Sequence, residues 1–399
     1  MENQENPTAE DFMLIDKMLK KDLREAAKNL GIHEARYLVD LYYTAQKFRM
    51  ATDSQKRAAE GYNEPTTFLS NVFSQFSTIE HNIQLSLDVY TDNHPIGKRV
   101  RTVKGMGPVM TAGLIANLKI ALPRKAYIAE GASTELVPVH SVGAWWRYCG
   151  LDPTLKWTGR EDTSMLLKEV NSEYEGKTDD LGKLSVICHR LNRRLGDVLY
   201  YTNHIASVFT SEEAFELCSV IRGDKVKGKA EFHADNIFKE LLPDPAEPYR
   251  ITMEDTFLSW DAIRKFLCKR PYNANLKRLC WLIGESFVKV KNREGAMYGK
   301  IYAETRAKYD VMNDNLHYQE EAARRLKANR TKMDKSLAKL YESGKLPDKA
   351  LHERAKRVAV KMFLSHMHQV WFEHEFGRTP PEPYPIAILG HKDYVAPSF

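Results

Sequence analysis

Cysteine is scarce in this chain, with five residues among 399, and the five are widely spaced with no C-x-x-C pair. Disulfide frameworks and zinc modules both need close or paired cysteines, so the sequence indicates neither. No apolar run is long enough to cross a bilayer, and the N-terminal segment MENQENPTAEDF is polar and acidic. We therefore expect a cytoplasmic protein with reduced cysteines and no membrane partner.

The patterns of metal-dependent nucleases and of phosphate-processing enzymes are also missing. No series of strands carries the aspartates that hold two metal ions, and there is no H-N-H-like cluster or P-loop. His366, His368 and His374 are close in sequence, but positions i and i+2 of a helix point to different faces, so we predict no shared metal. No cofactor is indicated, and the residue pattern favours a binding protein over an enzyme.

The net charge of +6 is unevenly distributed along the chain. Residues 286–361 hold 19 Lys and Arg against 10 Asp and Glu, whereas residues 161–260 hold 12 against 19. A basic region interspersed with tyrosines is typical of a surface that binds a polyanion. Basic runs are equally common on solvated helix faces, so the charge alone leaves both interpretations open.

The most informative stretch is the glycine turn Gly105-Met106-Gly107-Pro108. Two glycines allow a tight turn, and Pro108 suits the first turn of a following helix. A helix that starts after such a turn presents unpaired amide groups, which suit a phosphate. The residues leading into the turn are basic: Lys98, Arg99, Arg101 and Lys104. We predict a helix–hairpin–helix that binds a nucleic-acid backbone without reading bases; the alternative is a plain corner between two helices.

Helical periodicity dominates the N-terminal part of the chain. It predicts two helices over residues 10–60, interrupted at Gly31, and a third from Phe68 to Tyr90 with near-heptad spacing. The third helix is a candidate coiled-coil arm, whose partner is either the 32–60 helix or the same arm of a second copy. Residues 121–140 lack helical periodicity and contain Pro and Gly, so we predict a loop there.

Further helices are expected after the acidic region begins. The patterns predict one helix over 184–209, two pieces within 262–290, one long charged helix over 297–341 and another over 351–376, with a proline-rich surface strap at 379–385. The expected fold class is therefore all-α, in four segments: a dimerisation arm (1–95), the first part of the hairpin domain (96–153), an acidic insertion (154–262), and the second part of the domain with basic C-terminal helices (263–399).

Three stretches together resemble a known group of proteins: Gly105–Ala116, Trp145–Pro153 and Asn273–Lys277. They are similar to the C-terminal domain of bridge-RNA-guided insertion-sequence transposases, in which a glycine hairpin precedes a GL-x-P segment and a G-N-x-x-L-R helix. The same scaffold resembles the Nop domain of box C/D ribonucleoproteins and the Tas proteins of tandem interspaced guide RNA systems in phages and bacteria. Lys289–Tyr302 and Tyr384–His391 look closest to the nuclease-free, TasA-type Tas proteins.

This resemblance implies a homodimeric, RNA-guided DNA-binding protein without nuclease activity, whose partners are a guide RNA and a target DNA. It implies phosphate contacts at the hairpin from Lys98, Arg101, Lys104, Gly105 and Gly107. A second contact surface would comprise Arg270, Asn273, Asn275, Lys277 and Arg278. The basic helices would line a nucleic-acid channel with Arg324, Arg325, Arg354 and Arg357, and Lys289 would be a further nucleic-acid contact.

Two alternatives stay open at the level of sequence. The related transposases begin with a RuvC-like domain, which is replaced here by the helical arm, and carry a serine nucleophile in a Ser-Gly pair. The matching pair in this chain is Thr158-Gly159. A threonine hydroxyl needs an activating base to attack DNA, and none is evident beside it. The alternatives are thus a transposase or recombinase that uses Thr158, and a helix–hairpin–helix protein that binds DNA without a guide.

Overall fold

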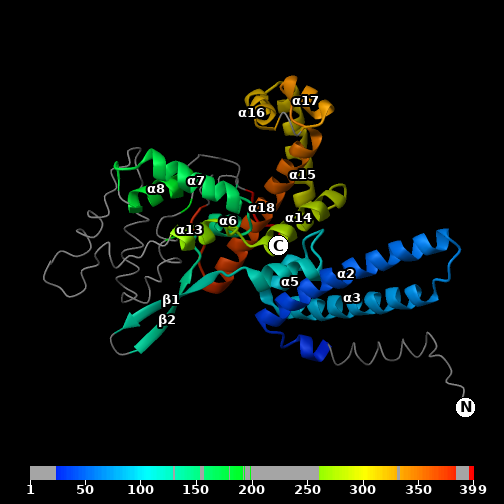
Figure 1. Ribbon diagram of the computed structural model, residues 1–399. Coiled ribbons are helices and arrows are strands. Elements are labelled where there is room, and N and C mark those ends of the chain that lie inside the picture. Colours follow the sequence, from blue (N-terminus) through cyan, green and yellow to red (C-terminus); the bar gives the residue numbers. More distant parts are fainter. Residues whose placement is uncertain are drawn as a thin grey trace, which may run out of the picture. The chain divides into compact units, whose positions relative to one another are not determined.

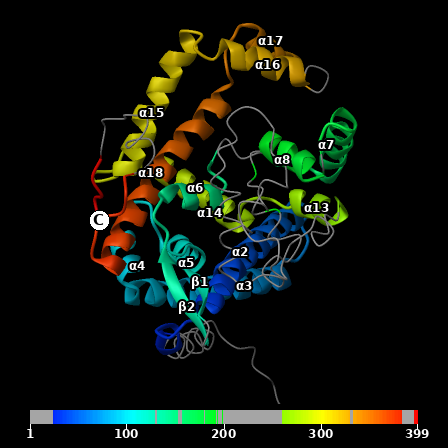
Figure 2. The ribbon, with the colours of Figure 1, turned by 90° about the vertical axis from the view of Figure 1, so that its left-hand side faces the viewer.

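A computed structural model describes residues 24–128, 131–152, 157–178, 180–191, 193, 198, 260–329, 333–382 and 395–399. These residues are mostly helical, with one two-stranded sheet, which confirms the all-α fold class (Figures 1 and 2). No helix among them has the length and apolar character that a bilayer span requires. The helix expected before residue 24, most of the acidic insertion and the segment 384–391 lie outside the described residues.

The chain divides into two compact units. The first comprises Met1–Ile120, His140–Trp145 and Asn275–Phe399, and the second comprises Ala121–Val139 and Trp146–Ala274. Each unit is built from segments that are distant in sequence.

The arm of the first unit consists of α2 (Ile32–Gly61) and α3 (Thr67–Asn93), which lie side by side (Figure 1). Apolar residues of the two helices are buried, among them Val39 and Leu87. Arg49 of α2 also forms an ion pair of 2.6 Å with Glu80 of α3. Gly31 precedes α2, which confirms the predicted interruption. Within one chain, the partner of the heptad-like helix is therefore the 32–60 helix.

The glycine turn connects α4 (Pro95–Arg101) with α5 (Pro108–Asn117), and α5 packs against both helices of the arm. Pro108 occupies the first turn of α5, as predicted. Val109, Leu114 and Ile115 of α5 are buried. The arm therefore serves as the support on which the turn is held.

The C-terminal part of the first unit contains α14 (Ala274–Lys289), α15 (Met297–Asp314), α16 (Gln319–Asn329), α17 (Lys335–Glu342) and α18 (Asp348–Phe376). Helices α15 and α18 lie side by side. Between α14, α15 and α18 is an aromatic core in which the ring of Phe363 lies 5.5 Å from Phe287 and 5.2 Å from Tyr298.

The prediction of a single helix over 297–341 is wrong. The chain breaks after α15, where Leu316 adopts a left-handed conformation with φ of 57°. The side-chain amide of Asn313 donates to the carbonyl of Leu346 at 3.1 Å and accepts from its N–H at 2.8 Å. The bend also lets Ala322, on α16, join a buried cluster with Tyr341 and Leu346. These long-range contacts offset the loss of a continuous helix.

In the second unit, α7 (Arg160–Glu173) packs against α8 (Asp180–Arg190) and against α13 (Trp260–Leu267). A short helix, α6 (Val142–Tyr148), passes from the first unit into the second. The two helical pieces expected within 262–290 correspond to α13 and α14. Only the first part of the helix expected over 184–209 falls within the described residues, where α8 contains it.

The prediction of a loop over 121–140 is wrong, because this stretch forms an antiparallel hairpin of β1 (Ala121–Ile128) and β2 (Gly131–Pro138). Ala121 pairs with Pro138, and Ile128 pairs with Gly131. Each strand is an edge strand, where a proline that cannot donate a ladder hydrogen bond is tolerated. The prolines that suggested a loop are therefore compatible with this two-stranded ribbon.

Candidate nucleic-acid interface

Gly105 fixes the shape of the turn between α4 and α5. Its φ is +98°, a value that residues with a Cβ rarely adopt. An added Cβ would also lie 3.2 Å from Phe287 and Ser286 of α14 and 3.3 Å from Val290. The hydroxyl of Ser286 donates a hydrogen bond of 2.6 Å to the Gly105 carbonyl. Gly105 is therefore needed for close packing of the turn on α14.

Gly107 precedes the start of α5, where Pro108 and Met110 are half-buried. No side chain caps this helix, and its first turn contains no acidic residue. The amides of Val109 and Met110 have no acceptor within the helix, because first-turn amides lack a preceding carbonyl. Together with the positive end of the helix dipole, they favour an anion.

A cavity of about 290 Å³ opens at this helix start. Four helices contribute to its wall: α2, α3, α5 and α14. The lining includes Tyr42, Tyr43, Gln84, Ser286 and Lys289, together with the first residues of α5. The cavity thus combines amide donors and a cation with two aromatic rings.

Exposed cations surround the same turn. Lys104 directly precedes Gly105. Because Gly105 lies next to Ser286 and Val290, Lys104 is brought near the end of α14, where Lys289 and Lys291 are exposed. None of these three lysines forms an ion pair with another described residue. The glycine motif and the basic region after residue 286 therefore meet, although they are far apart in sequence. Lys291 is not among the nucleic-acid contacts expected from the sequence. Only the excess of basic residues over 286–361 points to it.

Other residues predicted near the hairpin already have partners. Arg101 pairs with Asp88 and lies 3.1 Å from the Thr91 hydroxyl, both on α3. Lys98 is exposed and forms no ion pair within the described part of the chain. Lys98 is thus available to an anion, whereas Arg101 joins α4 to α3.

The predicted second surface is divided between the two units. In the second unit, the Arg270 guanidinium lies 5.3 Å from the Trp157 ring centre, and the Asn273 N–H donates to the Tyr148 carbonyl at 2.9 Å.

On α14, in the first unit, Asn275 donates to Asp40 at 3.3 Å and Arg278 lies 5.1 Å from the centre of the Tyr43 ring. Lys277 is exposed on the same helix. Asn275 and Arg278 therefore hold α14 against α2.

The four predicted arginines of the C-terminal helices fall into two classes. Arg354 of α18 pairs with both carboxylate oxygens of Glu321 and covers the ring of Tyr318 at 4.9 Å. Arg325 pairs with the same carboxylate at 2.8 Å. Burial, the largest single influence, would raise the pKa of Glu321, but the hydrogen bonds and positive charges of Arg354 and Arg325 together outweigh it and hold the pKa below its usual range. Arg324 and Arg357, in contrast, are exposed and have no ion pair among the described residues.

The hydroxyl of Thr158 is hydrogen-bonded to another side chain. The Oγ1 atoms of Thr158 and Thr163 are 2.7 Å apart, and Thr163 donates its own hydrogen to the Gly159 carbonyl. Thr158 must therefore donate to Thr163. No base among the described residues contacts the Thr158 hydroxyl, whose bond to Thr163 lies at the start of α7.

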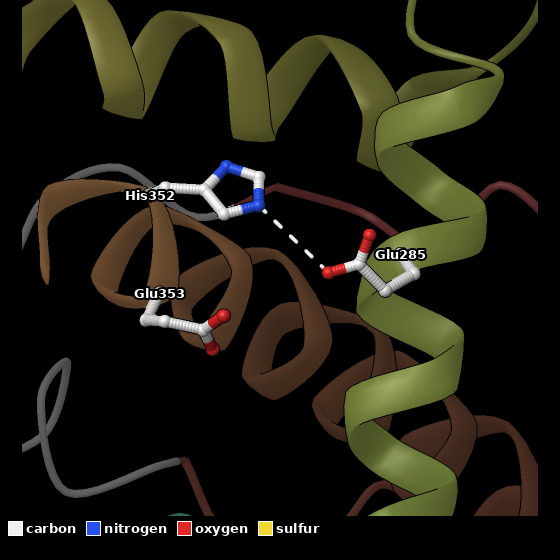
Figure 3. Close-up of side chains that lie close together, drawn as sticks. All are labelled: Glu285, His352 and Glu353. Atoms are coloured by element: carbon white, nitrogen blue, oxygen red, sulfur yellow. Dashed lines mark ion pairs between the residues drawn. The ribbon is translucent and has the colours of Figure 1, made fainter. Parts of the chain in front are cut away.

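Glu285, His352 and Glu353 form a cluster whose potential ligand atoms all lie within 4.8 Å of one another (Figure 3). His352 Nε2 is 3.8 Å from Glu285, and its Nδ1 is 2.7 Å from the Tyr302 hydroxyl. The ammonium of Lys356, only 3% exposed, forms ion pairs with both carboxylates. A lysine thus already bridges the two carboxylates of this cluster and ties α14 to α18.

Comparison with known proteins gives no further assignment. No protein-family model, no curated protein and no solved structure matches this chain. The interpretation of the interface therefore depends on its own geometry and on the sequence motifs.

Proposed function

We propose that this protein binds a structured RNA at the α4–α5 turn and that the RNA directs it to DNA by base pairing. One observation carries the binding part: the uncapped start of α5 and the exposed Lys104, Lys289 and Lys291 meet at one turn. Amides and lysines bind the phosphates of a nucleic acid whatever its base sequence. Sequence would then be read by the guide, as the resemblance to RNA-guided proteins suggests.

The arm is the proposed site of homodimerisation. Several large apolar side chains of α2, α3 and their connection are exposed: Phe48, Met50, Tyr62, Phe68 and Ile79. Burial of such side chains against a second copy would be favourable. We assign no catalytic step to the chain, because the Thr158 hydroxyl is bonded to Thr163 and lacks a base among the described residues.

A salt titration tests the binding proposal. The affinity of a fluorescein-labelled RNA hairpin is measured from low to high salt for the wild type and for Lys104→Glu/Lys289→Glu. Each lost phosphate contact should reduce the slope of log affinity against log salt by about one. We expect weaker binding and a slope lower by about two.

Lys168→Glu is the matched control. Lys168 is exposed on α7 and, in common with Lys104 and Lys289, forms no ion pair with a described residue. It should leave affinity and slope unchanged. Equal affinity of the double variant and the wild type at low salt would overturn the proposal.

A further inference from the structure

We propose that the cavity at the start of α5 receives one unstacked nucleotide of the bound RNA, with its phosphate at the α5 amides and Lys289 and its base against the two tyrosines. This inference rests on the proposed function and adds the kind of RNA that the site prefers. It concerns the cavity of about 290 Å³ between α2, α3, α5 and α14.

The size of the cavity argues for more than a phosphate. A volume of about 290 Å³ is close to the lower end of the range for small-molecule sites, which starts at roughly 300 Å³. Along α14 the lining runs from Leu282 to Lys289, and the seven helical steps between these residues cover about 10 Å at 1.5 Å per step. That length is comparable to one nucleotide measured from its phosphate to the far edge of its base.

The two ends of this run differ chemically. Ser286 and Lys289 lie at the end that approaches the glycine turn, where the α5 amides attract an anion. Tyr43 lies beside Arg278 and Leu282 at the other end, and its ring contacts that of Tyr42 edge-to-face with centres 5.3 Å apart. A phosphate end and an aromatic end fit a nucleotide better than a simple anion or an apolar side chain.

The polar groups of the lining suit a base edge. Gln46 donates to Glu80 at 3.1 Å, which holds its amide in place and leaves its oxygen as an acceptor. Gln84 has an exposed amide without a partner among the described residues. Burial raises the pKa of Tyr43 to about 12, so its hydroxyl remains neutral at working pH. Bases that leave the stack are typically held by aromatic rings and by hydrogen bonds to their edges.

The negative charge of Glu285 in the lining does not oppose a phosphate strongly. Its carboxylate is paired with the ammonium of Lys356 and lies near His352. Lys289 lies one helical turn further along α14 and is exposed. Lys289 therefore gives the phosphate end of the cavity a cation that is not paired with another described residue, in addition to the α5 amides.

The test compares two labelled RNA hairpins that differ only in one bulged nucleotide, which carries 2-aminopurine. The wild type should bind the bulged hairpin at least about tenfold more tightly than the paired one, and 2-aminopurine fluorescence should change on binding. Free adenosine and uridine 5′-monophosphates form a separate arm. If a free monophosphate binds as tightly as the bulged hairpin, the cavity is a mononucleotide site and the proposal is overturned.

Two variants test whether the preference arises in the cavity. Gln84→Trp should fill the cavity and bring the ratio of the two affinities close to one. Gln75→Trp, at an exposed position of the same helix outside the lining, should keep the ratio. Tyr42→Leu should lower the ratio without filling the space, and its thermal unfolding is compared with the wild type to confirm folding.

The outcomes separate the two proposals. Loss of the preference in Gln84→Trp with retention in Gln75→Trp supports the nucleotide cavity. An unchanged ratio in Gln84→Trp, with RNA binding intact, overturns the cavity proposal alone. Absence of binding to either hairpin by the wild type overturns the proposed function as well.

Discussion

Ser286 on α14 donates a hydrogen bond of 2.6 Å to the carbonyl of Gly105, which lies 181 residues earlier in the chain. This bond joins the glycine turn to α14, the helix that ends at Lys289. The cations and the uncapped start of α5 consequently meet at one place. The proposed interface depends on this junction more than on any single lysine.

Gly105→Ala should disrupt the junction. The new Cβ would lie 3.2 Å from Phe287 and Ser286 at a φ of +98°, so we expect a loss of roughly 1–2 kcal/mol in the free energy of unfolding, with weaker RNA binding. Gly107→Ala is the matched control, since Gly107 has φ of −96° and open space around a Cβ. Because Gly107 is the N-cap of α5, where glycine is favoured over alanine, the loss for this variant should be about 0.5–1 kcal/mol and smaller than that of Gly105→Ala. Equal denaturant midpoints for the two variants would contradict this account.

Arg354 and Arg357 should behave differently although both are on α18. Arg354→Gln removes the paired contact with Glu321, so we expect unfolding to become easier by about 2 kcal/mol. Arg357→Gln removes an exposed cation with no ion pair in the described part of the chain, and should alter only RNA affinity. Chemical denaturation of both variants, followed by the salt titration, checks the distinction. If Arg354→Gln lowered the free energy of unfolding no more than Arg357→Gln does, the pair of Arg354 with Glu321 would contribute little to stability.

Lys356, rather than a metal, should hold the acidic cluster together. Lys356→Met leaves the partly exposed Glu285 and Glu353 without their common cation, so we expect a loss of about 1–3 kcal/mol. Neither EDTA nor added zinc should shift the melting temperature of the wild type. A melting temperature that falls with EDTA and recovers with zinc would identify a metal site instead.

Protonation of His366 should lower stability in weak acid. Burial lowers the pKa of His366 below its usual value, and the carbonyl of Val395 partly offsets this by accepting from Nε2. The Tyr298 hydroxyl must then donate to Nδ1, which a second proton would prevent. The unfolded chain therefore takes up the proton more readily than the folded one.

The contribution of His366 is fully present above the unfolded pKa of about 6.5 and is lost as the pH falls towards the lower folded pKa. Denaturant midpoints between pH 7.5 and 5 should fall less steeply for His366→Asn than for the wild type. His94, whose pKa is lowered by burial and by His374, should retain part of the slope. Identical slopes would remove His366 from this account.

Local chemistry explains what could be predicted from the sequence. Gly105, Gly107 and Pro108 determine a turn and a helix start through their own backbone preferences, and both are present. The break at Leu316 could not be foreseen, because it depends on Asn313 reaching Leu346 and on burial of Ala322. Helical periodicity in the sequence carries no information about such long-range contacts.

The candidate site was predictable only in part. Lys104 and Lys289 could be chosen from charge and motif, but their convergence depends on the contact of Ser286 with Gly105. In the sequence, Arg101 and Arg354 cannot be distinguished from arginines that have no ion-pair partner. Only the structure shows that they pair with Asp88 and Glu321. The cavity needs four helices at once and has no signal in any one segment.

The most direct test of the central claim is to purify the protein from cells and sequence the nucleic acid that accompanies it. We predict a discrete population of small RNAs that remains bound through purification and is lost from Lys104→Glu/Lys289→Glu at moderate salt. A nucleic-acid-free absorbance spectrum, with no discrete small RNA recovered, would contradict the claim.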